Sequence, residues 1–294
     1  MMIMKNETKK MLRLSSDVSS SKIFLGKKGL GKYTVAKTMA AEKLSVSIDK
    51  LEYEPSFREI NGELSIDELR KVLQNALYKS SKDNIILVDM AEKLSIDEQN
   101  VLLKTIEEGK AIVYFITTDT LLDTIHSRCH TIEFFPYEET LLEAELTKNN
   151  VSVNHTALQL CGGCPGIYFN LTQDTSFLNE MEEMLSEFQK MQKKEDVVII
   201  MKRLGLLNDK SKSSFFEKYA DWQVAAVLEG ILNIYVTAFT KAILSENHCL
   251  SFYSIVELED CIRRLKKLIA NTKKTRLDCL ETIMLLKGGK AYVV

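Results

Sequence analysis

The amino-acid sequence predicts an α/β module with a parallel sheet, followed by a region in which helices pack on helices. Up to Pro136, short apolar segments alternate with helical patterns, and a glycine-rich turn follows the first of these segments. Such alternation is typical of repeated strand and helix units, whose strands run parallel. Beyond Pro136, apolar residues recur three and four positions apart, which favours helices with one buried face. We therefore expect the fold class to change once along the chain.

The first region contains three expected strands, at Lys22–Leu25, Asn84–Asp89 and Ile112–Thr117. Each is a short apolar run, and helical patterns separate it from the next one. The first helix is expected to begin near Thr34, directly after the glycine-rich turn. The arrangement predicts a sheet whose strands all end at the same edge.

The second region contains two segments with an apolar face at helical spacing, residues 222–242 and 258–269. In the later segment, basic residues lie between the apolar positions. This pattern has two interpretations, a solvated face beside a core face or a surface for a partner or for DNA. Residues 189–196 and 208–214 are polar and are expected to be connectors. No strand is expected in this region.

Composition excludes several classes of protein. The 294 residues carry 39 Lys and Arg against 41 Asp and Glu, so the net charge is −2, unlike that of a dedicated nucleic-acid binder. With 45% hydrophobic and 27% charged residues, the chain is not expected to be disordered. Six cysteines are too few for a disulfide scaffold and indicate the reducing cytoplasm. The apolar run at 230–240 is about half of the ~20 residues that a membrane span needs.

A phosphate-binding loop is predicted at residues 26–33, with the sequence GKKGLGKY. It matches GxxxxGK and lies between an expected strand and an expected helix, which is the context such a loop requires. Glycines allow backbone N–H groups to converge on an anion, and the lysine can neutralise phosphate charge. The candidate phosphate-binding residues are Gly26, Gly29, Gly31 and Lys32.

Two positions depart from the pattern of a nucleotide-hydrolysing site. Tyr33 stands where a small hydroxyl would contact Mg²⁺, and a phenol cannot place its oxygen there. Asp89 ends a buried strand where a metal-side acid belongs, but Met90 follows it, and a thioether can neither accept a proton nor align a water. Glu92 is the nearest substitute, and we expect it to project elsewhere.

The residues after the second strand resemble the clamp-loader branch of the AAA+ proteins. The resemblance rests on residues 89–108 (DMAEKLSIDEQNVLLKTIEE), on 115–118 and on 121–129, which end in the triplet Ser127-Arg128-Cys129. In particular the chain is similar to the delta-prime family of subunits of bacterial DNA polymerase III. The resemblance implies an AAA+ module at 1–135, a small helical lid at 136–177 and an all-α collar at 178–294 that joins five subunits in a ring.

The resemblance also implies roles and partners. In this family the arginine corresponding to Arg128 is presented to ATP held by the neighbouring subunit, where a permanently charged guanidinium can fork onto phosphate oxygens. The expected partners are the gamma/tau and delta subunits, with the sliding clamp and primer-template DNA engaged through the complex. No cofactor or metal of its own is expected, apart from weak ATP or phosphate binding near Lys32 and Asp89.

Other positions of the family pattern are less complete. Thr117 and Thr118 follow the third strand where a polar sensor residue is kept, although either could simply end the strand. Ile167 occupies a position where ATP-binding relatives place an arginine, and an isoleucine cannot contact a phosphate. Cys161 and Cys164 form a CxxC pair, but no second pair at suitable spacing completes a zinc site.

Three hypotheses follow from the sequence. The first is a non-catalytic clamp-loader subunit that assembles the ring and donates Arg128 to a neighbouring ATPase. The second is an active clamp-loader ATPase of the gamma/tau kind, which requires turnover by the isolated chain. The third is an AAA+-derived scaffold of another replication or repair complex, which would not join loader subunits.

Overall fold

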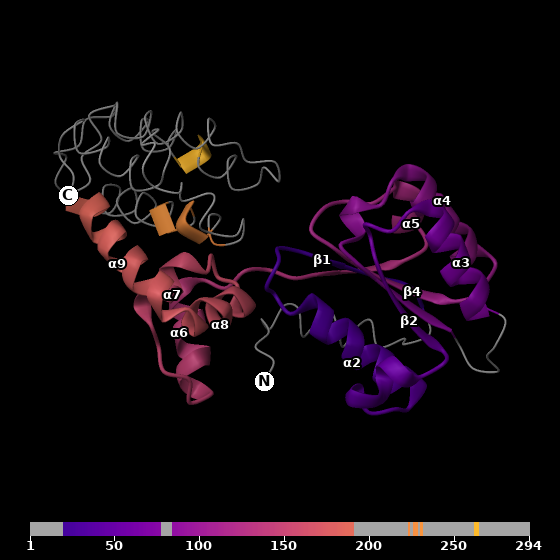
Figure 1. Ribbon diagram of the computed structural model, residues 1–294, viewed down its shortest axis with the longest axis horizontal. Coiled ribbons are helices and arrows are strands. Elements are labelled where there is room, and N and C mark those ends of the chain that lie inside the picture. The colour runs from indigo at the N-terminus through magenta and orange to yellow at the C-terminus, as the bar shows by residue number, and fades with distance from the viewer. Residues whose placement is uncertain are drawn as a thin grey trace. The chain divides into compact units, whose positions relative to one another are not determined.

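The computed structural model describes residues 20–77, 84–190, 223, 226–228, 230–231 and 262–264. The chain divides into two compact units (Figure 1). The first contains the described residues up to Tyr137 together with Cys164–Ile167, and the second contains the rest. Each unit is described by itself below.

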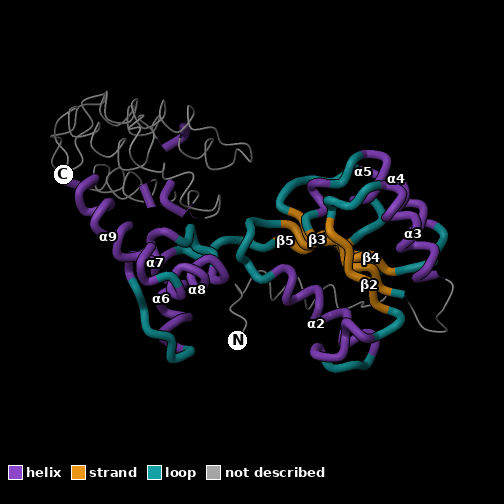
Figure 2. The backbone as a smooth tube through the Cα atoms, in the orientation of Figure 1, coloured by secondary structure: helices purple, strands orange, loops and turns teal. Residues whose placement is uncertain are grey.

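The first unit is built on a five-stranded parallel sheet. Its strands are β1 (Lys22–Leu25), β2 (Phe57–Asn61), β3 (Ile85–Asp89), β4 (Ile112–Thr117) and β5 (His130–Glu133). They lie in the order β2-β3-β4-β1-β5, and every neighbouring pair is parallel. Figure 2 shows the strands of this unit in orange among its helices. Leu25 pairs with Thr117, and Asn61 pairs with Asp89, so the strands end at a common edge. Ligands of open α/β sheets bind at this carboxyl edge.

Helices cover both faces of this sheet. One face carries α2 (Lys32–Leu44) and the 3-10 helix η1 (Ile48–Tyr53), and the other carries α3 (Ile66–Leu77), α4 (Ile96–Glu107) and α5 (Asp123–His126) (Figure 1). A short 3-10 turn, η2 (Ala91–Lys93), joins β3 to α4. The strand side chains alternate between the two apolar cores, since Phe24 packs on the α2 side and Ile23 on the opposite side.

The start of α4 is fixed by its own sequence. The Ser95 side chain accepts a hydrogen bond from the Glu98 backbone N–H, and the Glu98 carboxylate accepts one from the Ser95 N–H, which is a complete capping box. This helix carries residues 99–107 of the family pattern, and Glu108 is its C-cap. Its register therefore determines where those side chains lie.

The described part of the second unit is helical. It contains α6 (Glu139–Lys148), α7 (His155–Leu160), α8 (Pro165–Gln173, whose first three residues belong to the first unit) and α9 (Thr175–Lys190). Tyr168 is fully buried, and its hydroxyl donates to the Ser152 carbonyl oxygen and accepts from the Asn154 N–H, both at 2.9 Å. A Cβ at Gly230 would lie 2.6 Å from Leu160, so residues from the described part of 223–231 pack closely on these helices.

The sequence predictions agree with this architecture in the middle of the sheet. The three expected strands are present, and the change to helices after Pro136 holds for the described residues up to 190. The first helix begins at Lys32, two residues before the expected start, and β2 and β5 were not predicted. Residues 189 and 190 belong to α9, so the expected connector begins later than residue 189. Most of 178–294, including the expected collar helices, lies outside the described residues.

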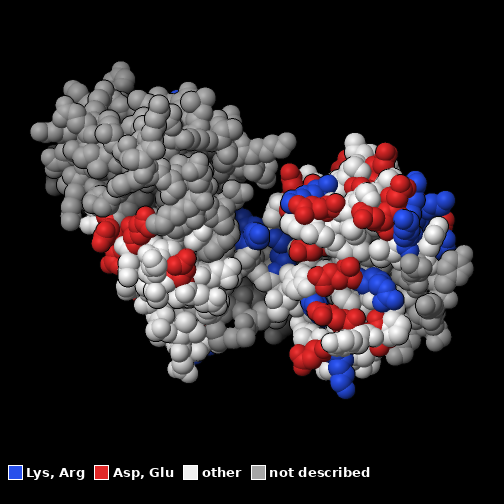
Figure 3. All heavy atoms as spheres, in the orientation of Figure 1, with Lys and Arg blue, Asp and Glu red and all other residues white. Residues whose placement is uncertain are grey.

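Over the described ranges, no helix combines the length and the apolar character that crossing a membrane requires. Acidic and basic side chains are interspersed on the visible face of the first unit (Figure 3). This mixture agrees with the near-neutral net charge of the chain.

Candidate functional site

The loop between β1 and α2 has the backbone conformation that its glycines predict. Gly29 and Gly31 both have φ of +84°, and the Gly26 N–H donates to the Thr117 carbonyl oxygen at 3.2 Å. A Cβ on Gly26 would lie 2.4 Å from the Phe134 carbonyl oxygen, so only glycine allows this approach. The loop therefore lies at the carboxyl edge of the sheet, where its first residue contacts the end of β4 and the residue after β5.

Lys32 is folded onto its own loop. Its ammonium group donates to the carbonyl oxygens of Gly26 and of Lys27, the latter at 2.8 Å, and the side chain is buried. Burial lowers the pKa of Lys32 to about 8, an effect that the negative charges of Glu92 and Asp89 oppose. The group that would neutralise a phosphate is therefore satisfied by the backbone of the loop.

Residues Cys164–Ile167 form an apolar cover on this loop, and they belong to the same unit. The Gly166 N–H donates to the Gly29 carbonyl oxygen at 2.8 Å, and a Cβ on Gly29 would lie 2.7 Å from Cγ1 of Ile167. Cys164 and Ile167 also pack into the core on the α2 side. Ile167 thus lies against the loop, as the family pattern implies, but it brings an aliphatic group where a cation would be needed.

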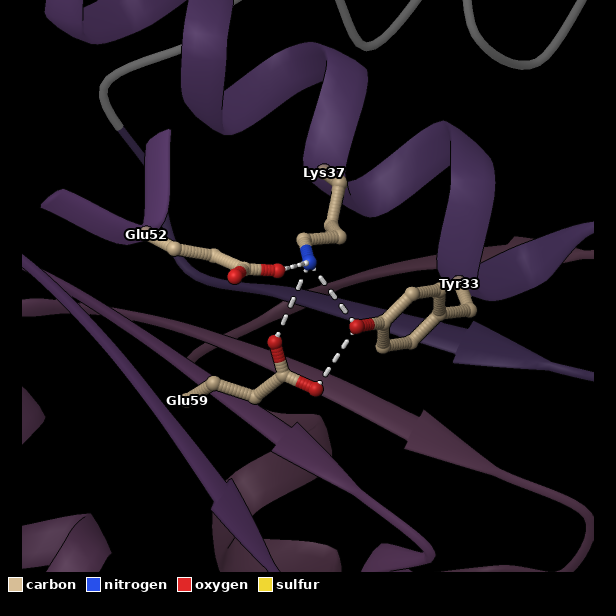
Figure 4. Close-up of polar contacts among 4 residues, drawn as sticks. All are labelled: Tyr33, Lys37, Glu52 and Glu59. Atoms are coloured by element: carbon tan, nitrogen blue, oxygen red, sulfur yellow. Dashed lines mark hydrogen bonds and ion pairs between the residues drawn. The ribbon is translucent and has the colours of Figure 1, made fainter. Parts of the chain in front are cut away.

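Tyr33 belongs to a polar cluster with Lys37, Glu52 and Glu59 (Figure 4). Its hydroxyl donates to Glu59 at 2.7 Å and accepts from the Lys37 ammonium at 2.9 Å. Lys37 also bonds Glu52 at 2.9 Å and lies 3.3 Å from the other oxygen of Glu59. Three elements, α2, η1 and β2, are joined by these contacts.

The cluster shifts the ionisation of its members. Burial and the Glu59 carboxylate raise the pKa of Tyr33, against the hydrogen bond from Lys37. Although burial alone lowers it, the pKa of Lys37 is raised by its bonds to Tyr33 and Glu52 and by the charge of Glu59. The phenol is consequently a neutral donor, and its oxygen is bonded to Glu59 and Lys37 instead of being free to act as a magnesium ligand.

Asp89 and Glu92 lie at the end of β3. The Asp89 carboxylate accepts from the Met90 N–H at 2.9 Å, and Met90 has φ of +51°. The Glu92 carboxylate accepts from the Thr118 N–H at 3.2 Å. We expected Glu92 to project elsewhere than the position that follows Asp89. Its carboxylate is bound at Thr118, after β4, and its negative charge acts on Lys32. The turn of η2 returns it toward β4.

The two candidate sensor threonines differ in their surroundings. Thr117 is buried, and its hydroxyl donates to the Asp119 carbonyl oxygen at 2.7 Å and accepts from the Asp119 N–H at 3.1 Å. Both bonds lie within this local turn, so the hydroxyl group of Thr117 is already hydrogen-bonded. Thr118 is exposed and contributes its N–H to Glu92.

Arg128 lies just after α5, with its side chain 43% exposed. One terminal nitrogen, Nη1, donates to the Thr124 carbonyl oxygen at 3.1 Å and to the Ser127 hydroxyl at 3.0 Å. The other, Nη2, lies 2.8 Å from the Glu107 carboxylate. The guanidinium is therefore held in place at the surface.

Gln99 connects α4 to the segment that carries Arg128. Its side chain is buried, donates to the Leu94 carbonyl oxygen at 3.2 Å and accepts from the Leu122 N–H at 3.0 Å. Sequence reasoning included Gln99 and Glu107 in the family pattern without assigning them a contact. It missed Lys37 and Glu59, although Lys37 lies four residues after Tyr33 and so shares its face of the helix.

Among the residues that the structure describes, no group of three or more His, Cys, Asp and Glu side chains is arranged to hold a metal ion. Cys161 and Cys164 are both buried, and neither is in a disulfide. Cys129 is half-buried, and burial raises the pKa of its thiol to about 12. A thiol with such a pKa stays protonated and is a poor metal ligand.

These features define a class of protein. A parallel five-stranded sheet with helices on both faces, a glycine loop after β1 and an acidic residue at the end of β3 form the α/β module of a phosphate-loop protein. Residues 46–138 match the model of a family described as DNA polymerase III, delta subunit.

Relatives of known name agree with this match. The chain is 31% identical over 141 residues to the DNA polymerase III subunit delta-prime of Haemophilus influenzae, covering 44% of this chain and 42% of that protein. It is also 31% identical over 150 residues to a replication factor C small subunit of Methanoregula boonei, covering 46% and 45%. Over the matched part, the chain is therefore similar to clamp-loader subunits of the delta-prime and replication factor C kinds. These matches span less than half the length of either relative.

Solved structures show more distant likeness. A DNA polymerase III gamma subunit-related protein of Thermotoga maritima is 14% identical, with a TM-score of 0.43 over 97% of this chain and all of that one. The RuvB branch migration motor of the same organism is 17% identical, with a TM-score of 0.40 over 79% of this chain and 76% of that one.

Proposed function

We propose that this chain is a clamp-loader subunit that does not turn over ATP itself and that presents Arg128 to ATP held by a neighbouring subunit. The observation that carries the absence of ATP turnover is that groups of the chain itself occupy the phosphate loop. The Lys32 ammonium is bound by loop carbonyl oxygens, and Ile167 packs against Gly29. A phosphate would have to displace both groups.

The chemistry around the loop supports the same conclusion. The phenol of Tyr33 is bonded to Glu59 and Lys37, so it supplies no oxygen for Mg²⁺. Met90 stands where a water-orienting carboxylate is needed. The residues present therefore do not fit Mg²⁺ with a nucleotide, and no catalytic step is assigned to this loop.

The accessibility of Arg128 supports the second part. Its guanidinium is held through Thr124 and Ser127 of its own turn, yet the side chain remains 43% exposed. A cation that is fixed by local bonds and open to solvent can be offered to a phosphate of another chain with little reorganisation.

The sequence relatives support a proposal about the assembly. We propose that the partners are the ATP-hydrolysing gamma/tau subunits and the delta subunit, and that the sliding clamp and primer-template DNA are engaged by the complex. The same proposal places the helical lid at 136–177 and the collar at 178–294.

The experiment is a reconstitution of the cognate loader with the full chain, measuring ATP hydrolysis in the presence of clamp and primer-template DNA. Arg128→Ala should assemble normally and lower hydrolysis at one interface by about tenfold or more, because an arginine supplied in trans stabilises transition-state charge. Arg70→Ala, which removes another exposed arginine of the same unit, is the matched control and should have no effect. Equal rates for the native chain and Arg128→Ala would refute the donor role.

One observation favours the alternative, an active ATPase of the gamma/tau kind. Glu92 lies close enough to Lys32 for its charge to oppose the lowering of the lysine pKa, and Asp89 is present at the end of β3. Turnover of ATP by the isolated chain, abolished by Lys32→Ala, would establish this alternative.

A further inference from the structure

We propose that Glu107 is a positioning residue that binds Arg128 until the phosphate of a neighbouring subunit displaces it. This inference rests on the donor role proposed above and adds a regulatory contact to it. Its starting observation is the 2.8 Å distance between Nη2 of Arg128 and Oε1 of Glu107.

The contact divides the guanidinium into two halves. Nη1 is bound by Thr124 and Ser127, which lie in the same turn of the chain as Arg128 itself. Nη2 is bound by a carboxylate from another helix, the last residue of α4. The local bonds can persist while the carboxylate is exchanged for another anion, because they use a different nitrogen. The half that faces Glu107 is therefore the exchangeable one.

The position of Glu107 on its helix favours this pairing. A carboxylate in the last turn meets the partial negative charge of unpaired carbonyl groups, so it needs a nearby cation. The adjacent carboxylate, Glu108, has lysine partners in Lys104 and Lys110. Glu107 instead pairs with Arg128, so the two neighbouring carboxylates are held by different cations.

Exchange requires that the ion pair of Glu107 with Arg128 be weak in water. It also requires that the incoming anion bind Arg128 more strongly than Glu107 does. Both side chains are 43% exposed, and pairs of this exposure contribute little because solvent screens them. A nucleotide phosphate carries more charge than a carboxylate, so it accepts a stronger hydrogen bond from Nη2. Such an anion can replace the single carboxylate when the subunits meet, and the carboxylate competes with it until then.

The test uses the reconstituted loader and titrates a fluorescent ATP analogue into it. The relevant site is the one at which Arg128→Ala weakens binding. Glu107→Gln removes the competing charge and should tighten analogue binding there by about two- to fivefold, the scale of an exposed ion pair. Glu107→Asp keeps the charge and should restore the native affinity. Glu108→Gln changes the same charge one residue away and should leave the affinity unchanged.

The outcomes separate the two proposals. If Arg128→Ala itself leaves binding and hydrolysis unchanged, the donor role fails. If Arg128→Ala acts but Glu107→Gln leaves the affinity unchanged or weakens it, the donor role stands and the competition by Glu107 is refuted. Glu107→Gln combined with Arg128→Ala should bind like Arg128→Ala alone, since the carboxylate acts only through the arginine.

Discussion

Lys32 is the residue whose environment contradicts its motif most directly. In a working phosphate loop the lysine neutralises an anion. Here the ammonium is buried on the carbonyl oxygens of its own loop. The desolvation that results has a measurable consequence, because it disfavours the charged form of the side chain.

The stability of the chain should depend on pH through Lys32. Its pKa is about 8 in the folded chain and 10.5 as the ordinary value, so between these pH values the unfolded chain binds more protons. Below pH 8, the buried charge of Lys32 therefore lowers the free energy of unfolding by its full amount. As the pH rises from 8 to 10.5, the free energy of unfolding increases again. The effect is on the order of 3 kcal/mol at most.

Urea denaturation at pH 7, 8, 9 and 10 measures this dependence. Lys32→Met should lose the rise in unfolding free energy that the native chain shows above pH 8. Lys50→Met, at an exposed lysine on η1, should keep it. Identical pH profiles for the native chain and Lys32→Met would show that the ammonium is not desolvated.

Tyr33 gives a second prediction at this scale. Tyr33→Thr supplies the small hydroxyl that the motif lacks, but Lys32 remains on the loop carbonyls and Ile167 remains against Gly29. The isolated variant should therefore show no more binding of a fluorescent ATP analogue than the native chain. Strong Mg²⁺-dependent binding by this single variant would mean that Tyr33 alone blocks the site.

The contact between the phosphate loop and Cys164–Ile167 belongs to the scale of elements. Gly29 and Gly31 share the same φ of +84°, so an alanine at either incurs the same backbone strain, about 1 to 2 kcal/mol. A Cβ at Gly29 also meets Ile167, whereas no atom lies within 4 Å at Gly31. Gly29→Ala should lower the free energy of unfolding by a further ~1 to 3 kcal/mol beyond Gly31→Ala. Equal losses, measured by urea denaturation, would show that Ile167 does not press on the loop.

The strands show how far the sequence predicts this fold. The predicted strands β1, β3 and β4 occupy the middle of the sheet, where both faces are buried and the sequence is continuously apolar. The two that were missed, β2 and β5, are the edges. Their sequences, FREIN and HTIE, are short and polar at the exposed positions, so they resemble loops.

The candidate site was also predictable in part, because some of its residues belong to local sequence patterns. The glycine loop, Asp89 and Arg128 follow from local patterns, and the structure places the first two at the carboxyl edge of the sheet. The contact of Ile167 with Gly29 joins residues far apart in the sequence. The bond of Tyr33 to Glu59 required β2, which was not predicted. Long-range packing therefore decides what the loop can bind.

At the scale of the whole molecule, the division into units differs from a simple succession of domains. Cys164–Ile167 is grouped with the sheet module, although the residues on either side belong to the second unit. Domain ranges that are continuous in the sequence cannot assign these four residues to a unit that otherwise ends earlier in the chain. The expected domains at 1–135, 136–177 and 178–294 remain predictions.

The central claim is that this chain acts through Arg128 and not through its own phosphate loop. Arg128→Ala and Lys32→Ala, compared in the same reconstituted loader after both are shown to assemble, test it most directly. We expect a fall of about tenfold or more in hydrolysis at one interface for Arg128→Ala, and no change for Lys32→Ala. If Lys32→Ala abolished hydrolysis and Arg128→Ala left it unchanged, the central claim would be contradicted.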